Sequence, residues 1–258
     1  MIKALTSAAA LLAACIVFMP SAHAAALTGS VSLTDRPWVC QGPVNLASVT
    51  VVIRTAQTDA IHLAAGCTGT IGRVTVIQYH GDGIKVGPGA HDLSIGGGSI
   101  RCLAHDVGKH QDGIQAMGGQ RITFNGLSDL CSSANNSAFF VNEGAAGHQV
   151  PDTIVCVACT LEGGGFPVRI GRSVNSGVRS SRVCPGKFGS VRVSPGIAQN
   201  PVDVGTVLVA SIAGVPLCAS SGSTPPANPA GPAPATTTTQ APAAKAEGRH
   251  HRHRRHAG

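Results

Sequence analysis

The sequence predicts an all-β fold: a single right-handed parallel β-helix (a solenoid), followed by a disordered C-terminal tail. Three observations predict it. Valine, isoleucine and threonine dominate the apolar runs, and the chain contains 33 glycines, a composition that favours strands joined by tight bends. The apolar residues show almost no helical periodicity. Short segments with alternating apolar residues recur at intervals of 23 to 30 residues, as a stacked solenoid requires.

The first 24 residues have the pattern of a secretory signal peptide. Lys3 supplies the positive charge, residues 8–19 are apolar, and Ala22-His23-Ala24 is a small-residue cleavage site. We therefore expect residues 1–24 to be removed and the protein to be exported, to the periplasm or to the outside of the cell. The expected folded domain spans residues 26–218.

The internal repeat defines the strands of this domain. Six five-residue segments align, and each has apolar residues at its third and fifth positions. The third positions should form one inward-facing stack, and a second strand of the same phase follows at residues 92–95 and 121–124. The leucine spacing and the asparagine of a leucine-rich repeat are missing. The six segments are 59–63, 82–86, 112–116, 137–141, 166–170 and 189–193.

The C-terminal tail, residues 219–258, differs from the domain in composition and charge. It consists mostly of Ser, Pro, Ala and Thr and ends in an Arg/His run at 249–256, so it cannot bury enough apolar surface to fold. The tail holds four of the seven net positive charges, which leaves the domain with about +2 once Lys3 is removed. We expect the tail to bind anionic surfaces without specificity, and we expect no specific nucleic-acid binding.

Nine cysteines are present, and Cys15 lies in the signal peptide, so an even number remains in the exported chain. Equivalent positions on adjacent coils lie about 4.8 Å apart, which suits a disulfide. Coil spacing favours Cys102–Cys131 and Cys40–Cys67. The Cys-x-x-Cys motif is interpreted as structural, with either cysteine paired to Cys184 and the other to Cys218. The eight candidates are Cys40, Cys67, Cys102, Cys131, Cys156, Cys159, Cys184 and Cys218.

A family resemblance appears in the middle of the repeat. The string His110-Gln111-Asp112-Gly113-Ile114-Gln115, followed by residues 118–119 and 121–125, resembles the coils of pectin-lyase-like right-handed β-helix proteins. Residues 82–95 repeat the pattern, and the resemblance covers roughly residues 59–193. It implies an exported, carbohydrate-active protein that binds or cleaves an acidic, uronate-containing polysaccharide, as a lyase or a glycoside hydrolase.

Strand alternation places the candidate site residues. Lys85 and its equivalents in later segments point outward in one column, and Asp82 and Asp112 form a second column at the bend. The resemblance implies that Asp112 is a catalytic carboxylate, that Arg169 or Lys85 is a base or a carboxylate clamp, and that Asp82 and Asp112 hold calcium. No other cofactor is expected. The substrate-binding candidates are His110, Gln115 and Arg192.

Two alternatives stay open. Asp82 and Asp112 can instead accept hydrogen bonds from backbone amides at tight bends. The chain can also be a non-catalytic binding or structural β-helix protein that its Arg/His tail tethers to an anionic cell surface. In either case we expect a monomer.

Overall fold

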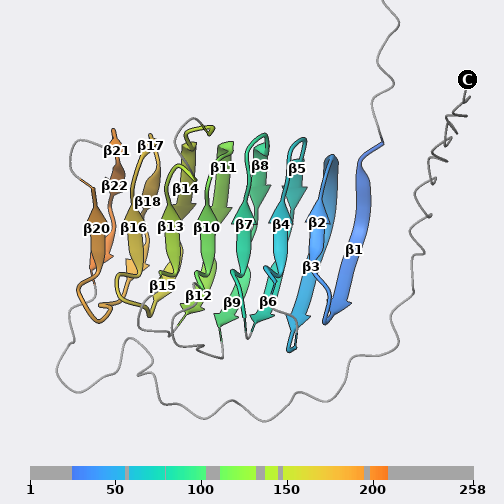
Figure 1. Ribbon diagram of the computed structural model, residues 1–258, viewed down its shortest axis with the longest axis horizontal. Coiled ribbons are helices and arrows are strands. Elements are labelled where there is room, and N and C mark those ends of the chain that lie inside the picture. The colour runs from blue at the N-terminus through green and yellow to red at the C-terminus, as the bar shows by residue number, and fades with distance from the viewer. Residues whose placement is uncertain are drawn as a thin grey trace, which may run out of the picture. The chain divides into compact units, whose positions relative to one another are not determined.

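The computed structural model describes residues 25–208, except 56–57, 79, 103–110, 132–136, 145–147 and 195–197. These residues form strands and no helix, and every strand pair is parallel, so the predicted all-β parallel solenoid is confirmed (Figure 1). The described part of the chain contains no helix that is long and apolar enough to cross a membrane. The predicted tail, His110 and Cys218 lie outside the described residues.

One side of the solenoid is a seven-stranded sheet with one short strand from each coil. All six predicted segments contribute a strand, and consecutive strands pair at the predicted positions, for example Ile84 with Ile114 and Ile114 with Phe139. One further strand, which contains Trp38, was not among the six predicted segments. Trp38 pairs with Ile61 of the first predicted segment. In order, the strands are β2 (Trp38–Cys40), β4 (Ile61–Leu63), β7 (Ile84–Val86), β10 (Ile114–Ala116), β13 (Phe139–Val141), β16 (Val168–Ile170) and β20 (Val191–Val193).

A 16-stranded sheet forms the other two sides. The long strand β3 (Pro43–Ile53) starts both sides, since its first residues pair with β5 (Thr68–Ile71) and its last with β6 (Val74–Gln78). The β5 side continues through β8 (His91–Ile95), β11 (Gln120–Asn125), β14 (Asp152–Val157), β17 (Ser173–Val174) and β21 (Ala198–Gln199). The β6 side continues through β9 (Gly98–Cys102), β12 (Leu127–Cys131), β15 (Thr160–Glu162), β19 (Arg182–Val183) and β23 (Val207–Leu208). In addition, β1 (Leu27–Thr34) pairs with β3, and β18 (Gly177–Arg179) and β22 (Val202–Val204) extend the sheet from β14.

The core lies between these three sides and consists of stacked apolar columns. The predicted inward stack is confirmed: its members from Ile61 to Val168 are fully buried, and Val191 on the last coil is partly buried and packs against them. Phe139 is the largest side chain of this stack. Its ring contacts Phe124 edge to face, with 6.3 Å between the ring centroids.

Two of the predicted disulfides are confirmed. Cys102 lies directly opposite Cys131 on the neighbouring strand, and both that pair and Cys40–Cys67 are bonded. The predicted link between the Cys-x-x-Cys motif and Cys184 is wrong, and so is a link from that motif to Cys218, because both cysteines of the motif are engaged with each other.

The bond between Cys156 and Cys159 closes a very short loop. The chain turns between them at Ala158, whose φ of 53° is left-handed, and this turn brings the two Cα atoms to 5.9 Å. Cys184 is also disulfide-bonded.

Candidate functional site

The outer surface of the seven-stranded sheet carries the predicted column of polar side chains. Strand register places Lys85 opposite Gln115, and Arg169 opposite Arg192, so the column is confirmed. Its members are not equally accessible: Gln115 is 7% exposed, whereas Arg192 is exposed. The full column from the first coil to the last is Val39, His62, Lys85, Gln115, Phe140, Arg169 and Arg192.

Near the N-terminal end of this column, two carboxylates neutralise the ammonium group of Lys85. Lys85 Nζ lies 3.4 Å from Asp59 Oδ2 and 3.7 Å from Asp82 Oδ2. Two carboxylates therefore share one cation. A role for Lys85 as a catalytic base or substrate clamp stays a prediction.

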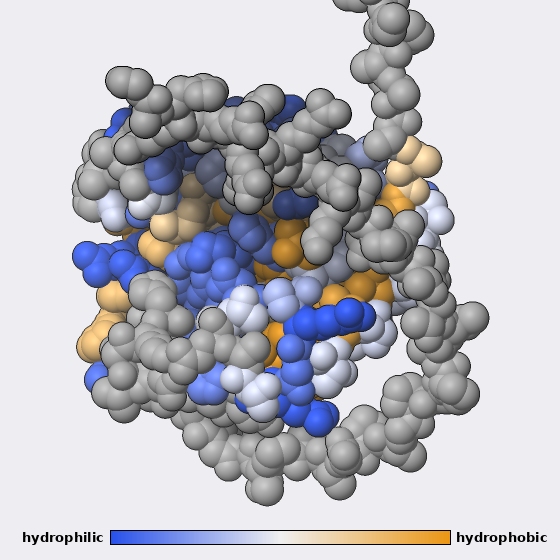
Figure 2. Space-filling model, turned by 45° about the vertical axis from the view of Figure 1, so that its right-hand side comes forward, coloured by the Kyte–Doolittle hydropathy of each residue, from blue (hydrophilic) through white to orange (hydrophobic). Residues whose placement is uncertain are grey.

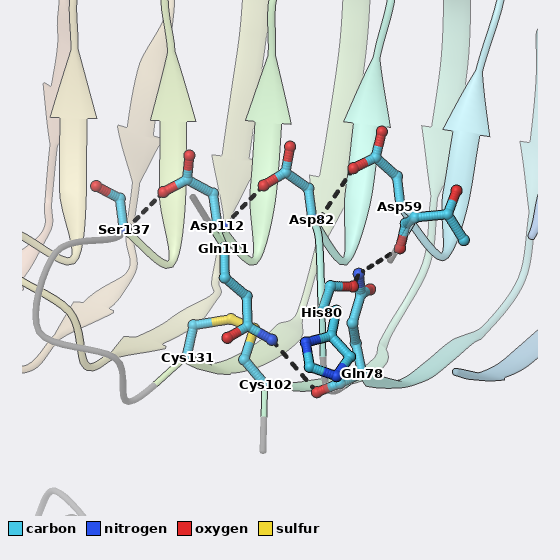
Figure 3. The surroundings of a disulfide bond; sticks show 10 residues. Asp59, Gln78, His80, Asp82, Cys102, Gln111, Asp112, Cys131 and Ser137 are labelled. Carbon is cyan, nitrogen blue, oxygen red and sulfur yellow. Dashed lines mark hydrogen bonds between the residues drawn. A yellow bond between two sulfur atoms is a disulfide. The ribbon is translucent and has the colours of Figure 1, made fainter. Parts of the chain in front are cut away.

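The carboxylates belong to a ladder that runs along the bend before the seven-stranded sheet (Figure 3). Asp59 Oδ1 accepts a hydrogen bond from Asp82 N at 3.0 Å, and Asp82 Oδ1 accepts one from Asp112 N at 2.8 Å. Asp112 Oδ1 in turn accepts one from Ser137 N at 2.7 Å. Asp82 and Asp112 thus accept hydrogen bonds from backbone amides, as the capping interpretation predicted, but the amides belong to the next coil and not to a local Asx-turn in the same bend.

Both aspartates of the ladder, Asp82 and Asp112, also have side-chain partners: Asp82 pairs with Lys85, and Asp112 with Gln115. Asp112 is fully buried, and its Oδ2 also accepts a hydrogen bond from Gln115 Nε2 at 3.2 Å. Within the described ranges, no group of three or more His, Cys, Asp or Glu side chains converges in a way that could hold a metal ion. Calcium binding and catalysis by Asp112 stay predictions.

Asp82 makes the ladder sensitive to pH. Burial, followed by the nearby charge of Asp112, raises the pKa of Asp82 from its ordinary value of 3.8 to about 7. Because the folded pKa exceeds the unfolded one, the folded state holds the proton more tightly. The resulting stability is complete below pH 3.8 and is lost as the pH rises through 7.

Replacing Asp82 with asparagine should therefore remove part of the pH dependence. The asparagine side chain is not ionisable but keeps an oxygen that can accept the Asp112 N–H bond. Between pH 4 and pH 8, the unfolding free energy of D82N should rise relative to that of the wild type, by roughly 4 kcal/mol at most. Urea unfolding at both pH values measures this difference. The exposed control D203N should follow the wild type, and an equal pH response of D82N and wild type would contradict the ladder.

Towards the C-terminal end, the outward column becomes part of a cation–aromatic cluster. The guanidinium carbon of Arg169 lies 4.8 Å from the ring centroid of Phe140. That of Arg192 lies 5.7 Å from the ring centroid of Phe166. The cluster comprises Phe140, Phe166, Arg169, Lys187, Phe188 and Arg192.

A tight turn carries two further members of the cluster. Gly186 and Gly189 exchange backbone hydrogen bonds of 3.0 and 3.4 Å, and Lys187 and Phe188 lie between them. Lys187 Nζ is 5.1 Å from the Phe188 ring centroid, and that ring lies 5.9 Å from Phe166. Phe188 is 59% exposed, the highest value for a large apolar residue in the described part of the chain.

The outward column predicted from the sequence contains three members of this cluster, Phe140, Arg169 and Arg192, but it did not predict the contact between Phe140 and Arg169. Phe166 is the first residue of the predicted segment 166–170 and lies before β16, and Phe188 lies in the bend before β20. Strand alternation does not predict the orientation of side chains at these two positions. A space-filling view shows hydrophilic residues gathered in the middle of one face, with hydrophobic residues beside them (Figure 2).

Comparison with known proteins adds no relative: no family model, no curated protein and no solved structure matches the chain. The resemblance to pectin-lyase-like coils is confirmed only as a parallel β-solenoid.

Proposed function

We propose that this chain is an exported protein that binds an acidic, uronate-containing polysaccharide through the cation–aromatic cluster. One observation supports this most strongly: three cations and three phenylalanine rings gather on the last three coils of one sheet. The disulfides are compatible with export, since disulfides persist in oxidising compartments.

The chemistry of the cluster fits that of an acidic sugar. A uronate ring has a carboxylate and an apolar C–H face. Arginine binds carboxylates with two parallel hydrogen bonds, and an exposed phenyl ring packs against apolar faces. Arg169 and Arg192 are register partners on adjacent parallel strands, about 4.8 Å apart at the backbone, so both side chains project from the same face of the sheet.

The geometry supports binding more than cleavage. Hydrolysis of a glycosidic bond normally needs two carboxyl groups that flank the bond. Asp112, the carboxylate that the resemblance implied, is fully buried and hydrogen-bonded through both oxygens. We therefore propose a binding protein, and cleavage is tested alongside binding.

Charge-removing variants test this function. Arg169→Gln/Arg192→Gln in the full chain should weaken polygalacturonate binding at least about a hundredfold, because each of the two lost charge-assisted contacts contributes about 1.5–3 kcal/mol and about 1.4 kcal/mol corresponds to a tenfold change in affinity. Calorimetric titration measures the affinity. Arg179→Gln/Arg182→Gln is the matched control: it removes the same charge from exposed positions on the other sheet and should bind like the wild type.

Two further measurements complete the test. Dextran, a neutral polymer, should not bind. A polyuronate panel incubated with the protein, with and without calcium, should give neither an increase in the absorbance of unsaturated products, which a lyase would form, nor new reducing ends, which a hydrolase would form. Equal affinity of the Arg169/Arg192 variant and the control would contradict the proposed site.

A further inference from the structure

Among the described strands, the inward columns of the core contain one acidic residue, Asp129 on β12. Strand register places it between Ile100 on β9 and Leu161 on β15, in a column that is otherwise aliphatic. Asp129 is fully buried. An ionisable side chain at such a position is unusual and needs a physical explanation.

Within the described part of the chain, neither carboxyl oxygen of Asp129 has a hydrogen-bond partner. The group instead packs against the backbone of Gly113, where an added β-carbon would lie only 1.9 and 2.2 Å from the two oxygens. Glycine at position 113 therefore leaves just enough room for the carboxyl group.

The charged groups around Asp129 do not favour a negative charge. Asp112, the residue before Gly113, repels a negative charge on Asp129. Asp82, whose Oδ1 accepts the hydrogen bond from Asp112 N, is the neighbouring carboxyl group of the ladder. Arg101 on β9 and Glu162 on β15 occupy positions of opposite alternation, on the outer surface of that sheet. Burial, followed by the charge of Asp112, raises the pKa of Asp129 well above its ordinary value.

We propose that Asp129 is a proton-binding site in the core, which holds its proton at neutral pH and opens the middle coils when alkaline solution removes it. An unpaired buried carboxylate costs several kcal/mol, so the neutral acid is the form that fits this site. Ionisation transfers the proton to water or hydroxide and leaves a charge beside Asp112 with no cation among the described neighbours. Opening the coil lets water reach that charge.

The direction of the pH effect follows from the folded and unfolded states. The folded state binds the proton more tightly, so the contribution to stability is complete below the ordinary pKa of 3.8. It is lost as the pH rises through the higher folded pKa. The switch therefore acts on the alkaline side, and acid does not trigger it.

Infrared spectroscopy of the full chain tests the protonation directly. Asp82 also titrates near neutral pH, so D82N is compared with D82N/D129N. The carbonyl band of a protonated carboxylic acid should persist at pH 8 in D82N and be absent from D82N/D129N. Identical spectra would overturn the proposal. Should the double variant not fold, carbon-13 NMR of the aspartate carboxyl carbons in D82N replaces it, and the absence of any protonated aspartate at pH 8 would overturn the proposal equally.

Thermal unfolding tests the switch. Asparagine has the size and shape of aspartate, so D129N should keep the packing against Gly113 without an ionisable group. Between pH 5 and pH 9, the midpoint temperature of the wild type should fall by about 4 °C or more relative to that of D129N. The exposed control D203N should follow the wild type. Equal pH dependence of D129N and wild type would contradict the switch.

Discussion

Replacing Phe139 with alanine should destabilise the protein by about 3–5 kcal/mol, the usual cost of emptying a buried phenylalanine site. The side chain is fully buried in the inward stack, and its ring contacts Phe124. Neighbouring coils cannot collapse into the space, because each is held in register by the parallel strands on both sides. Equilibrium unfolding in urea measures the loss.

The next residue in the chain is the matched control. Phe140 has the same side chain but points outward, below the guanidinium group of Arg169. F140A should change stability by no more than about 1 kcal/mol, while it should weaken polygalacturonate binding. Similar destabilisation by F139A and F140A would contradict the inward–outward alternation on which the fold and the site both depend.

Replacing Gly113 with alanine should be similarly damaging, at about 3 kcal/mol or more. The added methyl group would overlap the carboxyl group of Asp129, and neither the strand backbone nor the buried side chain has free space. Gly113 also accepts a hydrogen bond from Ile84 N and donates one to Ser137 O, which fixes its position between two coils.

Two variants control this prediction. At Gly97, a β-carbon would make only an ordinary contact of 3.5 Å, so G97A should be close to neutral. The double variant G113A/D129A removes the overlapping carboxyl group and should recover stability relative to G113A. If G113A were as stable as G97A, the packing of Asp129 against Gly113 would be incorrect.

The repeat in the sequence determines much of the fold. Alternating apolar residues in segments such as 84–86 and 114–116 predict the strand, its inward face and its partner on the next coil. Cys102 and Cys131 occupy equivalent coil positions, so their disulfide follows from the same spacing. These features were predictable because the hydrogen-bonded stack forces equivalent residues into register.

The features that were not predicted arise in the bends. A second strand was predicted on two coils, at 92–95 and 121–124, and β8 and β11 confirm it. Coil length varies, so the remaining extra strands and the turn that joins Cys156 to Cys159 have no fixed position in the repeat. Phe166 and Phe188 meet because two bends of different sequence adopt neighbouring positions. Asp129 was missed for another reason: alternation within β12 places it inward, whereas its chemistry argues for the surface.

Hydrogen exchange in the presence of polygalacturonate tests the proposed function most directly. The polymer should slow amide exchange in β13, β16, β20 and the turn at 186–189, since these segments carry the cation–aromatic cluster. Exchange in β1, β2 and β4 should not change, because those coils carry none of its members. Protection confined to other segments, or no protection at saturating polymer, would contradict the account.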